Sequence, residues 1–377
     1  MINNLIDYAK RQIYVCFVSL DVYPLFNTRA VSVQGGSEVD FYMLATELAI
    51  DNRFRVSIVT GDFGQPEVEI AGDITIYKAA DLRKKPISGV PALWKAMRRA
   101  DADIYFKKGP SLTTDLVALF CRLNHKIFFF RTAHDLDCDG TYLKQYPLRG
   151  KFYLWSLRQA KRVFVQKAAD LPNLLHTAGI NAIMIPNGHR IIDTPAIARD
   201  FILWVGRSEE FKQPRLFIEL AKEIPSEQFV MICQQTKGDL QYDRLLNQAV
   251  DVKNLEFIES VPFHEIKHYF SRAKIFVCSS RAEGFPNTFI QAGICATPIL
   301  SLTVNPDGLL DKYNCGVCCS GDAAKLLESL KSFLSQPRLL AEMGQNAKNY
   351  VSQYHDVAKI IEEYKRHFIE VAPKTSG

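Results

Sequence analysis

Short apolar runs alternate with amphipathic segments along nearly the whole chain. The apolar runs predict strands at 12–20, 54–60, 74–78, 103–106, 126–132, 162–166 and 182–186, and a second series at 201–206, 228–233, 255–258, 275–279 and 298–302. Helical periodicity lies between them, for example at 37–50, 111–123, 214–223, 264–271 and 287–296. Strands that are apolar at nearly every position are typical of sheets covered on both faces, and strand–helix alternation is typical of parallel, doubly wound sheets. The pattern therefore predicts an α/β fold with two such sheets.

The two series of strands predict two domains. Pro186-Asn187-Gly188 and the loose stretch up to Pro195 separate the series, so we place the linker near residues 187–199. We expect an N-terminal domain at 1–190, a C-terminal domain at 191–355, and an amphipathic helix with a tail at 356–377. Paired doubly wound domains bind ligands where the carboxyl ends of their strands meet. The residues that follow the strands are therefore the candidates for chemistry.

Composition narrows the class of protein. The 377 residues are 47% hydrophobic and 23% charged, which excludes a disordered chain and a disulfide scaffold. No stretch approaches the roughly 20 apolar residues that span a bilayer, and the run 13–20 predicts a buried strand rather than a signal peptide. The nine scattered cysteines favour free thiols in a reducing, cytoplasmic compartment. Cys315, Cys318 and Cys319 predict a core strand after Gly316 rather than a zinc site.

The positive charge is confined to one half of the chain. The formal net charge is +5, of which residues 1–195 carry +6 and the remainder −1. A basic half suits an anionic partner, and a merely solvated surface is an equal alternative. Because no nucleic-acid recognition motif accompanies the charge, we expect no nucleic-acid partner.

Two sets of candidate residues follow strands of the first series. Gly35-Gly36 precedes a helix, where glycine permits close approach of a ligand and the helix N-terminus attracts an anion. His134 ends a strong strand and suits hydrogen bonding to a hydroxyl or proton transfer. Neither is specific by itself, since a turn with an N-cap explains the two glycines better and a loop histidine explains His134 equally well.

Two further sets follow strands of the second series. Gly206-Arg207 and Lys212 place two cations where a diphosphate could bind, with ion pairs to Glu209 and Glu210 as the alternative. The stretch 279–292 contains Glu283-Gly284-Phe285-Pro286-Asn287 and then a helix, whose first N–H groups form an anion site. Beside a phosphate, a negative Glu283 suits acceptance of hydrogen bonds from sugar hydroxyls.

Together these segments resemble the GT-B retaining glycosyltransferases of the family 4 type (group 1). Five motifs stand in the family's order across nearly the whole chain: Gly35-Gly36-Ser37-Glu38, His134-Asp135, Pro186-Asn187-Gly188, Gly206-Arg207 with Lys212, and Glu283 to Asn287. The resemblance implies two Rossmann-like domains facing across a cleft. The first is the acceptor side, the second binds the nucleotide sugar, and the C-terminal helix packs back towards the first.

The resemblance also implies a role for each motif. Catalytic residues would be His134 at the transferred sugar, Glu283 at sugar hydroxyls, and Arg207 and Lys212 at the diphosphate. Donor-binding residues would be Gly35, Gly36, Gly206, Phe285, Pro286, Asn287, Thr288, Phe289 and Gln291, with the backbone of 287–289 completing a phosphate cradle. Gln291 stands where the family usually has a glutamate for the ribose, which places tight chelation of the ribose hydroxyls in doubt.

The implied activity is metal-independent, hexosyltransferase-like transfer with retention in the biosynthesis of cell-surface polysaccharide such as lipopolysaccharide. We expect no metal ion and no cofactor, and we assign no nucleophile. The acceptor would be a glycan or a lipid-linked glycan. A catalytically weak sugar-nucleotide-binding protein and a nucleotide-sugar 2-epimerase are the alternatives.

Basic and aromatic residues in the first half add a hypothesis about location. Two stretches combine them, residues 94–99 with Trp94 and residues 149–162 with Trp155, and Arg83-Lys84-Lys85 adds a basic run before them. Such stretches are typical of helices at an anionic membrane surface. We therefore expect a cytoplasmic protein with peripheral contact to the inner face of the membrane. The alternative, that Trp155 and its neighbours belong to the core, is equally consistent with the sequence.

Overall fold

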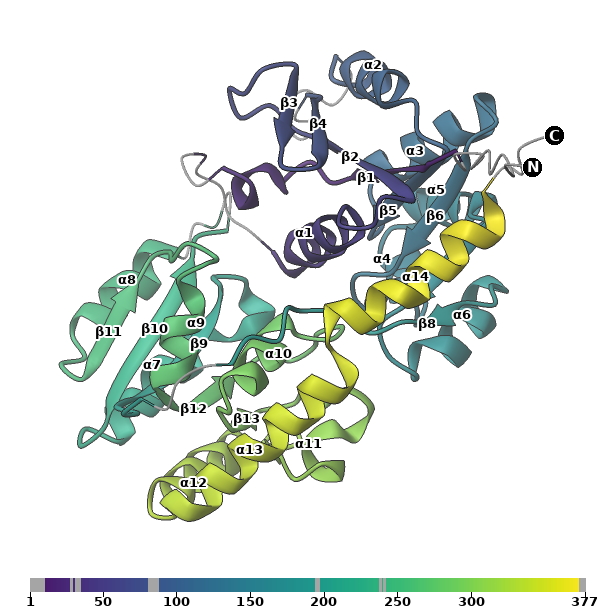
Figure 1. Ribbon diagram of the computed structural model, residues 1–377. Helices are drawn as coiled ribbons and strands as arrows, with labels where there is room; N and C mark the ends of the chain where they lie inside the picture. Colours follow the sequence, from purple (N-terminus) through teal and green to yellow (C-terminus); the bar gives the residue numbers. More distant parts are fainter. Residues whose placement is uncertain are drawn as a thin grey trace, which may run out of the picture.

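The chain folds around two sheets, one from each half of the sequence (Figure 1). The computed structural model describes residues 11–27, 30, 35–80, 88–193, 197–236, 239 and 242–372. All structural statements below concern those residues. The stretch Arg83-Lys84-Lys85 and the tail after residue 372 lie outside them.

The first sheet has eight strands in the order β3-β4-β2-β1-β5-β6-β7-β8. They are β1 (Ile13–Val18), β2 (Phe54–Thr60), β3 (Val68–Ala71), β4 (Ile74–Lys78), β5 (Ile104–Lys108), β6 (Ile127–Arg131), β7 (Arg162–Val165) and β8 (Ile183–Met184). The helices are α1 (Gly36–Leu48), α2 (Val90–Ala100), α3 (Leu112–Leu123), α4 (Thr141–Gln145), α5 (Pro147–Gln159) and α6 (Asp170–Ala178). All neighbouring strands pair in parallel except β3, which is antiparallel to β4.

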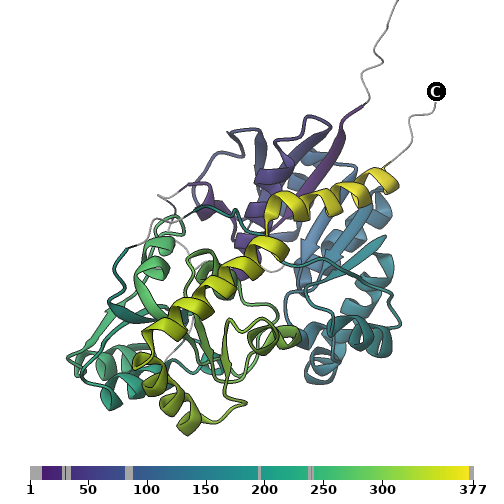
Figure 2. The same cartoon turned by 60° about the horizontal axis from the view of Figure 1, so that its bottom comes forward.

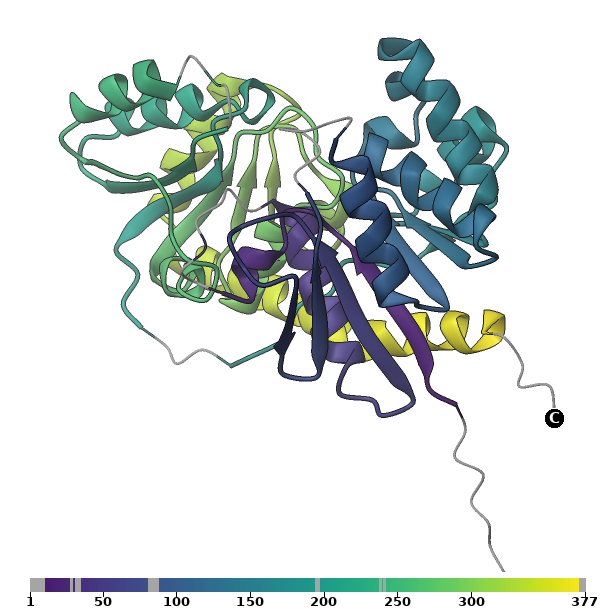
Figure 3. The same ribbon diagram turned by 90° about the horizontal axis from the view of Figure 1, so that it is seen from above.

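The second sheet has six strands in the order β11-β10-β9-β12-β13-β14, all parallel. They are β9 (Phe201–Arg207), β10 (Gln228–Gln234), β11 (Leu255–Ile258), β12 (Ala273–Cys278), β13 (Ile299–Ser301) and β14 (Gly316–Cys318). The helices are α7 (Pro214–Glu223), α8 (Tyr242–Val250), α9 (Ile266–Arg272), α10 (Asn287–Ile294), α11 (Leu309–Lys312), α12 (Ala323–Leu334) and α13 (Pro337–Tyr354). Figure 3 shows the two halves side by side.

Alternation along each strand explains the near-continuous apolar runs. In β1, Val15 and Phe17 belong to one core cluster, while Cys16 and Val18 belong to the cluster on the other face. The strands of the second sheet divide between two clusters in the same way. Side chains of successive strand residues point to opposite faces, so a sheet buried on both faces needs apolar residues at both positions.

Helix α14 (Val357–Val371) joins the two halves. After α13 in the second half, the chain passes to the first sheet (Figure 2). There Val357, Ile360, Ile361, Tyr364 and Phe368 enter the core. The carboxylate of Asp356 caps the helix by accepting from the N–H of Ala358 at 3.1 Å. The prediction that the C-terminal helix packs back towards the first half is confirmed.

The predicted α/β class with two doubly wound sheets is confirmed, with two corrections. The strand β3 was not predicted, and its antiparallel pairing means that the first sheet is mixed rather than purely parallel. Several predicted strands were too long, above all 182–186, of which only residues 183–184 form β8. The strand predicted after Gly316 is β14, with Cys315 and Cys319 buried beside it.

Candidate active site

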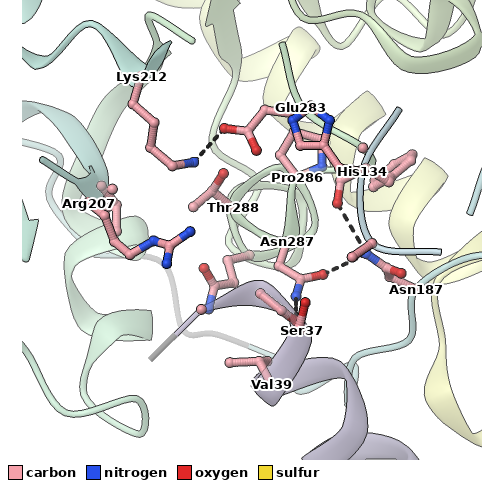
Figure 4. Close-up of a pocket in the computed structure, with 18 of the residues that line it drawn as sticks. Ser37, Val39, His134, Asn187, Arg207, Lys212, Glu283, Pro286, Asn287 and Thr288 are labelled. Carbon is pink, nitrogen blue, oxygen red and sulfur yellow. Dashed lines mark hydrogen bonds and ion pairs between the residues drawn. The ribbon is translucent and has the colours of Figure 1, made fainter. Parts of the chain in front are cut away.

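A cavity of about 310 Å³ lies between the two sheets. Its walls come from segments that follow the strands of both sheets, as expected where the carboxyl ends of parallel strands face one another. The lining contains every residue that the sequence singled out as catalytic or donor-binding except Phe289. Figure 4 shows how these side chains converge.

Phe289 is placed elsewhere. Its ring is buried in the core of the second half, 6.3 Å from the ring of Phe276, and its N–H donates to the carbonyl of Pro286 at 3.0 Å. In this structure the Phe289 N–H is already used within the first helical turn, and the role of its backbone in a phosphate cradle stays a prediction. Asn287 and Thr288 remain at the cavity wall.

The N-terminus of α10 forms one end of the cavity. Pro286 precedes the helix with extended backbone (φ −66°, ψ 121°), and Asn287 begins it. The first N–H groups of a helix have no partner within the helix, and its dipole favours negative charge there. Gln291 lies one turn further and also lines the cavity. This end of the cavity therefore suits an anion.

Lys212 and Glu283 face one another across the same wall. The ammonium nitrogen of Lys212 contacts Glu283 Oε1, which also accepts from Ser280 Oγ at 2.8 Å. Both side chains are mostly buried, with 18% and 15% exposed. The two predicted ligand-binding charges thus neutralise each other in the structure, and Ser280 adds a partner that the sequence did not reveal.

Arg207 ends β9 and points into the cavity (Figure 4). Its Nη2 lies 3.0 Å from Glu209 Oε2, which is the ion pair weighed above as the alternative to diphosphate binding. The guanidinium also faces the first half, since a Cβ on Gly35 would lie 4.0 Å from Arg207 Nη1. Arg207 therefore sits between its acidic neighbour and the Gly35-Gly36 loop.

The Gly35-Gly36 loop caps α1. The N–H of Gly35 donates to Glu38 Oε2 at 2.9 Å, so this N–H is occupied by a capping carboxylate. One turn along, Asp40 is fully buried and pairs with Lys108 at 2.8 Å and with Arg131 Nε at 3.0 Å. Burial alone would raise the pKa of Asp40, but the two cations outweigh it and hold that pKa below its ordinary value.

His134 presents a defined tautomer to the cavity. Its Nδ1 accepts from the N–H of Leu136 at 3.2 Å, so the proton of the neutral ring is on Nε2. Asp137 fixes the loop by accepting from the N–H groups of Ala133 and His134 at 2.7 and 2.9 Å. Burial raises the pKa of Asp137 to about 6. His134 therefore offers an N–H donor, and its ring packs 6.1 Å from that of Phe211 in the other half.

Other lining residues were not assigned by the sequence. Lys108, Gln166 and Asn187 come from the first half, and an apolar group comes from the second: Val205, Ile232, Val261, Phe263 and Ile266. The sequence signal for Lys108 was present, because a strand that ends in Lys107-Lys108-Gly109 places charge at the carboxyl edge of the sheet.

Among the described residues, no group of three or more His, Cys, Asp or Glu side chains is arranged to hold a metal ion.

Comparisons with known proteins agree with this geometry. Residues 194–350 match the model of the family described as glycosyl transferases group 1. Sucrose-phosphate synthase from Thermosynechococcus elongatus is similar in structure, with a TM-score of 0.79 and 17% identity over 96% of this chain and 99% of that one. A variant of TarM from S. aureus, solved with UDP, is similar with a TM-score of 0.74 and 12% identity over 95% of this chain and 100% of that one. The glycosyltransferase WaaG is similar with a TM-score of 0.68 and 14% identity over 96% of this chain and 100% of that one. No curated protein sequence matches the chain.

The fold is that of the GT-B glycosyltransferases, with near-complete coverage of these structures. The family match covers the second half, and the likeness in structure extends over nearly the whole chain.

Proposed function

We propose that the protein is a retaining glycosyltransferase that moves a sugar from a nucleotide-diphosphate sugar to a glycan or lipid-linked acceptor. The observation that carries the proposal is the cavity wall where Arg207, Lys212 and the N-terminus of α10 meet beside Glu283. Two cations and a helix N-terminus suit a diphosphate, and a carboxylate next to them suits sugar hydroxyls.

The chemistry follows from charge development. Cleavage of the bond between sugar and diphosphate builds negative charge on the leaving phosphate and positive character on the sugar. In the proposed mechanism Arg207, Lys212 and the start of α10 stabilise the leaving group, which takes the proton of the attacking acceptor hydroxyl. Attack on the face from which the diphosphate leaves retains the anomeric configuration. Nε2–H of His134 would donate to a sugar hydroxyl.

Entry of the donor changes the Lys212–Glu283 pair. A diphosphate would compete with Glu283 for Lys212, and the freed carboxylate oxygen would accept from the sugar. Gln291 would contact the ribose with its amide oxygen in place of the usual carboxylate. The apolar lining residues Ile232, Val261 and Phe263 would accommodate the base.

Donor turnover tests the proposal. We expect one nucleotide sugar in a screen of UDP-, GDP-, ADP- and CMP-sugars to raise the melting temperature and to be consumed with an acceptor, with activity unchanged by EDTA. Glu283→Ala should lower transfer by about 100-fold or more, since it leaves Lys212 unpaired and removes an acceptor from the sugar. Full transfer by Glu283→Ala would contradict the site assignment.

The same assay separates the two alternatives. A sugar-nucleotide-binding protein would show the thermal shift without turnover. A nucleotide-sugar 2-epimerase would convert the donor without an acceptor. Only a transferase couples consumption of the donor to a glycosylated product. Transfer to lipid-linked glycans rather than to free sugars would support a place in polysaccharide or lipopolysaccharide biosynthesis.

We further propose peripheral contact with an anionic membrane at the first turns of α5. Among the described residues no helix is long and apolar enough to cross a membrane. Tyr146, Leu148 and Phe152 are 46%, 70% and 53% exposed, and Arg149 and Lys151 beside them are also exposed. Because α5 returns the chain to the start of β7, its first turn lies at the edge of the sheet where β6 ends, the edge that carries His134.

The structure changes which aromatic residues carry this hypothesis. Trp155 packs against the core of the first half, and the ring of Trp94 packs 5.0 Å from that of Phe120, so neither is a free anchor. Flotation with phosphatidylcholine vesicles, with and without phosphatidylglycerol, tests the α5 surface. Leu148→Ser with Phe152→Ser should abolish binding, and Leu123→Ser, 61% exposed at the far end of α3, should not. No binding of the unaltered protein at low salt would contradict the proposal.

A further inference from the structure

Asn187 lies where the two halves of the chain meet, and it is 1% exposed. Its side-chain oxygen accepts from Arg131 Nη2 at 2.6 Å. Its side-chain nitrogen donates to the carbonyl of Phe285 at 3.1 Å and to Asn287 Oδ1 at 3.0 Å. Its backbone carbonyl lies 2.7 Å from Nδ1 of His355, at the junction of α13 and α14.

The partners of Asn187 fix the direction of its amide. An arginine side chain only donates, and a backbone carbonyl only accepts. The oxygen of Asn187 must therefore face Arg131, and its nitrogen must face Phe285. The same nitrogen also reaches Asn287 Oδ1, which leaves the Asn287 nitrogen to donate to the carbonyl of Gly36 at 2.8 Å (Figure 4). Hydrogen-bond polarity thus runs from Arg131 through both asparagines to Gly36.

The chain of contacts closes on itself through α1. Gly36 begins α1, and Asp40, one turn later, holds Arg131 Nε at 3.0 Å. The ring therefore consists of Asp40, Arg131, Asn187, Asn287 and Gly36. Asn287 is its one member from the second half. A Cβ on Gly36 would lie 3.2 Å from Asn287 Nδ2, so a larger residue there would require this amide to shift by a few tenths of an ångström. Asn287 also begins α10, whose N-terminus faces the cavity.

We propose that Asn187 is a positioning residue that holds Asn287 against Gly36, so that the start of α10 and the Gly35-Gly36 loop keep one arrangement across the cavity. This inference rests on the proposed function for its catalytic consequence. The two segments would then close on the donor diphosphate as one unit. The link through Arg131 and His355 anchors that unit to the sheet of the first half and to the start of α14.

The isosteric variant Asn187→Asp tests the link without a ligand. An aspartate still accepts from Arg131 but cannot donate to Phe285 or to Asn287. Asn254→Asp is the matched control, because Asn254 is also nearly buried and its amide donates to the carbonyls of Ala221 and Ile224 at 3.0 and 3.1 Å, all within the second half. Both variants lose buried donors, so both should melt at a lower temperature.

Hydrogen exchange on the ligand-free proteins distinguishes positioning from stability. We expect amides 37–42 and 287–292 to exchange at least about tenfold faster in Asn187→Asp, since a lost hydrogen bond is worth about that factor. In Asn254→Asp these two segments should exchange no faster than the rest of the chain. If segments 37–42 and 287–292 exchange at the same rate in Asn187→Asp and in Asn254→Asp, the proposal is overturned. This outcome does not depend on which reaction the protein catalyses.

Kinetics then tests the catalytic consequence. With the nucleotide sugar found in the screen, Asn187→Asp should lower kcat for transfer by about 10- to 100-fold and raise the share of donor lost to hydrolysis. Its affinity for UDP, GDP or ADP alone, whichever binds, should change less than about threefold, because the second half keeps its contacts. An equal loss of nucleotide affinity and kcat, matched by Asn254→Asp, would overturn a positioning role. Faster exchange in a protein that turns over no donor would instead contradict only the proposed function.

Discussion

Gly284, in the motif of the second half, lies directly against the backbone of the first half. A Cβ at this position would lie 2.8 Å from the carbonyl oxygen of Ala133 and 3.3 Å from Gln166 Nε2. A carbonyl that belongs to the loop of His134 cannot move aside as a flexible side chain can. The glycine in Glu283-Gly284-Phe285 is therefore required by contact across the cavity, and its backbone φ is not in the left-handed region.

Substitution of Gly284 is expected to separate activity from stability. Gly284→Ala should lower transfer by at least about tenfold, because the loop must retreat from Ala133 and the catalytic groups on either side lose their spacing. The melting temperature should stay within a few degrees, since each half keeps its own core. Steady-state transfer and thermal unfolding of the purified variant measure the two quantities. A variant as active as the parent would show that this contact does not matter for catalysis.

At the residue scale, sequence patterns identified the residues that meet the cavity but not those that hold them. Arg207, Lys212 and Glu283 follow strands, and position after a strand is visible in a sequence. Asn187 was noted as part of a motif, but its four partners come from distant segments. Arg131 closes an apolar strand and is fully buried, and nothing in the run Ile127–Arg131 distinguishes it from a solvated strand end.

Helix α14 shows what a single element contributes to the distant half. Phe368 is fully buried and its ring stacks on that of Phe129 with 5.4 Å between centroids. We expect Phe368→Ala to lower the free energy of unfolding by about 3–5 kcal/mol, the usual cost of removing a buried ring. Ile369→Ala is the control on the same helix, because Ile369 is 46% exposed and its loss should cost under about 0.5 kcal/mol. Denaturant unfolding of both variants gives the comparison, and equal values would contradict the packing of α14.

At the element scale, prediction worked where the apolar side chains of a strand reach a core cluster, as they do even in the edge strand β11 through Leu255, Phe257 and Ile258. The ranges of β2, β4 and β11 agree with the sequence pattern at both ends. The strand β3 was missed because it lies at the sheet edge with Val68 and Ile70 exposed at 45% and 76%. The four residues of β3 alternate apolar and polar side chains at Val68, Glu69 and Ile70, and they form no continuous apolar run in the sequence. Hydrophobic pattern reports burial, and an exposed edge strand has little of it.

The whole molecule should lose stability in acid through a histidine at the junction of its halves. Burial lowers the pKa of His355 from about 6.5 to about 4. Between these two pH values the imidazole is therefore neutral in the folded protein and protonated in the unfolded chain. Stability from this group is therefore complete above pH 6.5 and falls as the pH drops towards 4. At pH 5 the loss should be about 2 kcal/mol.

Buried carboxyl groups with a raised pKa, such as Asp137, stabilise the folded protein as the pH falls and so oppose the effect of His355. Comparison of the parent with His355→Gln cancels their contribution, because both proteins contain them. The difference in unfolding free energy between the parent and His355→Gln should shrink by about 2 kcal/mol from pH 7 to pH 5. His264→Gln is the control, since its side chain is 61% exposed and lies in no core cluster. A constant difference across this range would contradict the low pKa of His355.

At the scale of the molecule, the arrangement of the halves could be expected only through family resemblance. Alternating strands and helices predict two sheets but not how they face one another. That relation depends on contacts such as Asn287 with Gly36 and the carboxylate of Asp307 with the N–H groups of Ala168 and Ala169, at 2.9 and 3.2 Å. Single polar contacts between distant residues leave no periodic signal in a sequence.

The return of α14 to the first sheet has a consequence for biosynthesis. A ribosome completes the strands β1 to β8 long before it reaches residues 357–371, yet these residues supply Ile361, Tyr364 and Phe368 to the core that covers that sheet. The first half therefore leaves the exit tunnel with an apolar face uncovered, whereas all strands of the second half emerge before α14 is made. We expect the nascent first half to depend on chaperones until α14 has emerged from the ribosome.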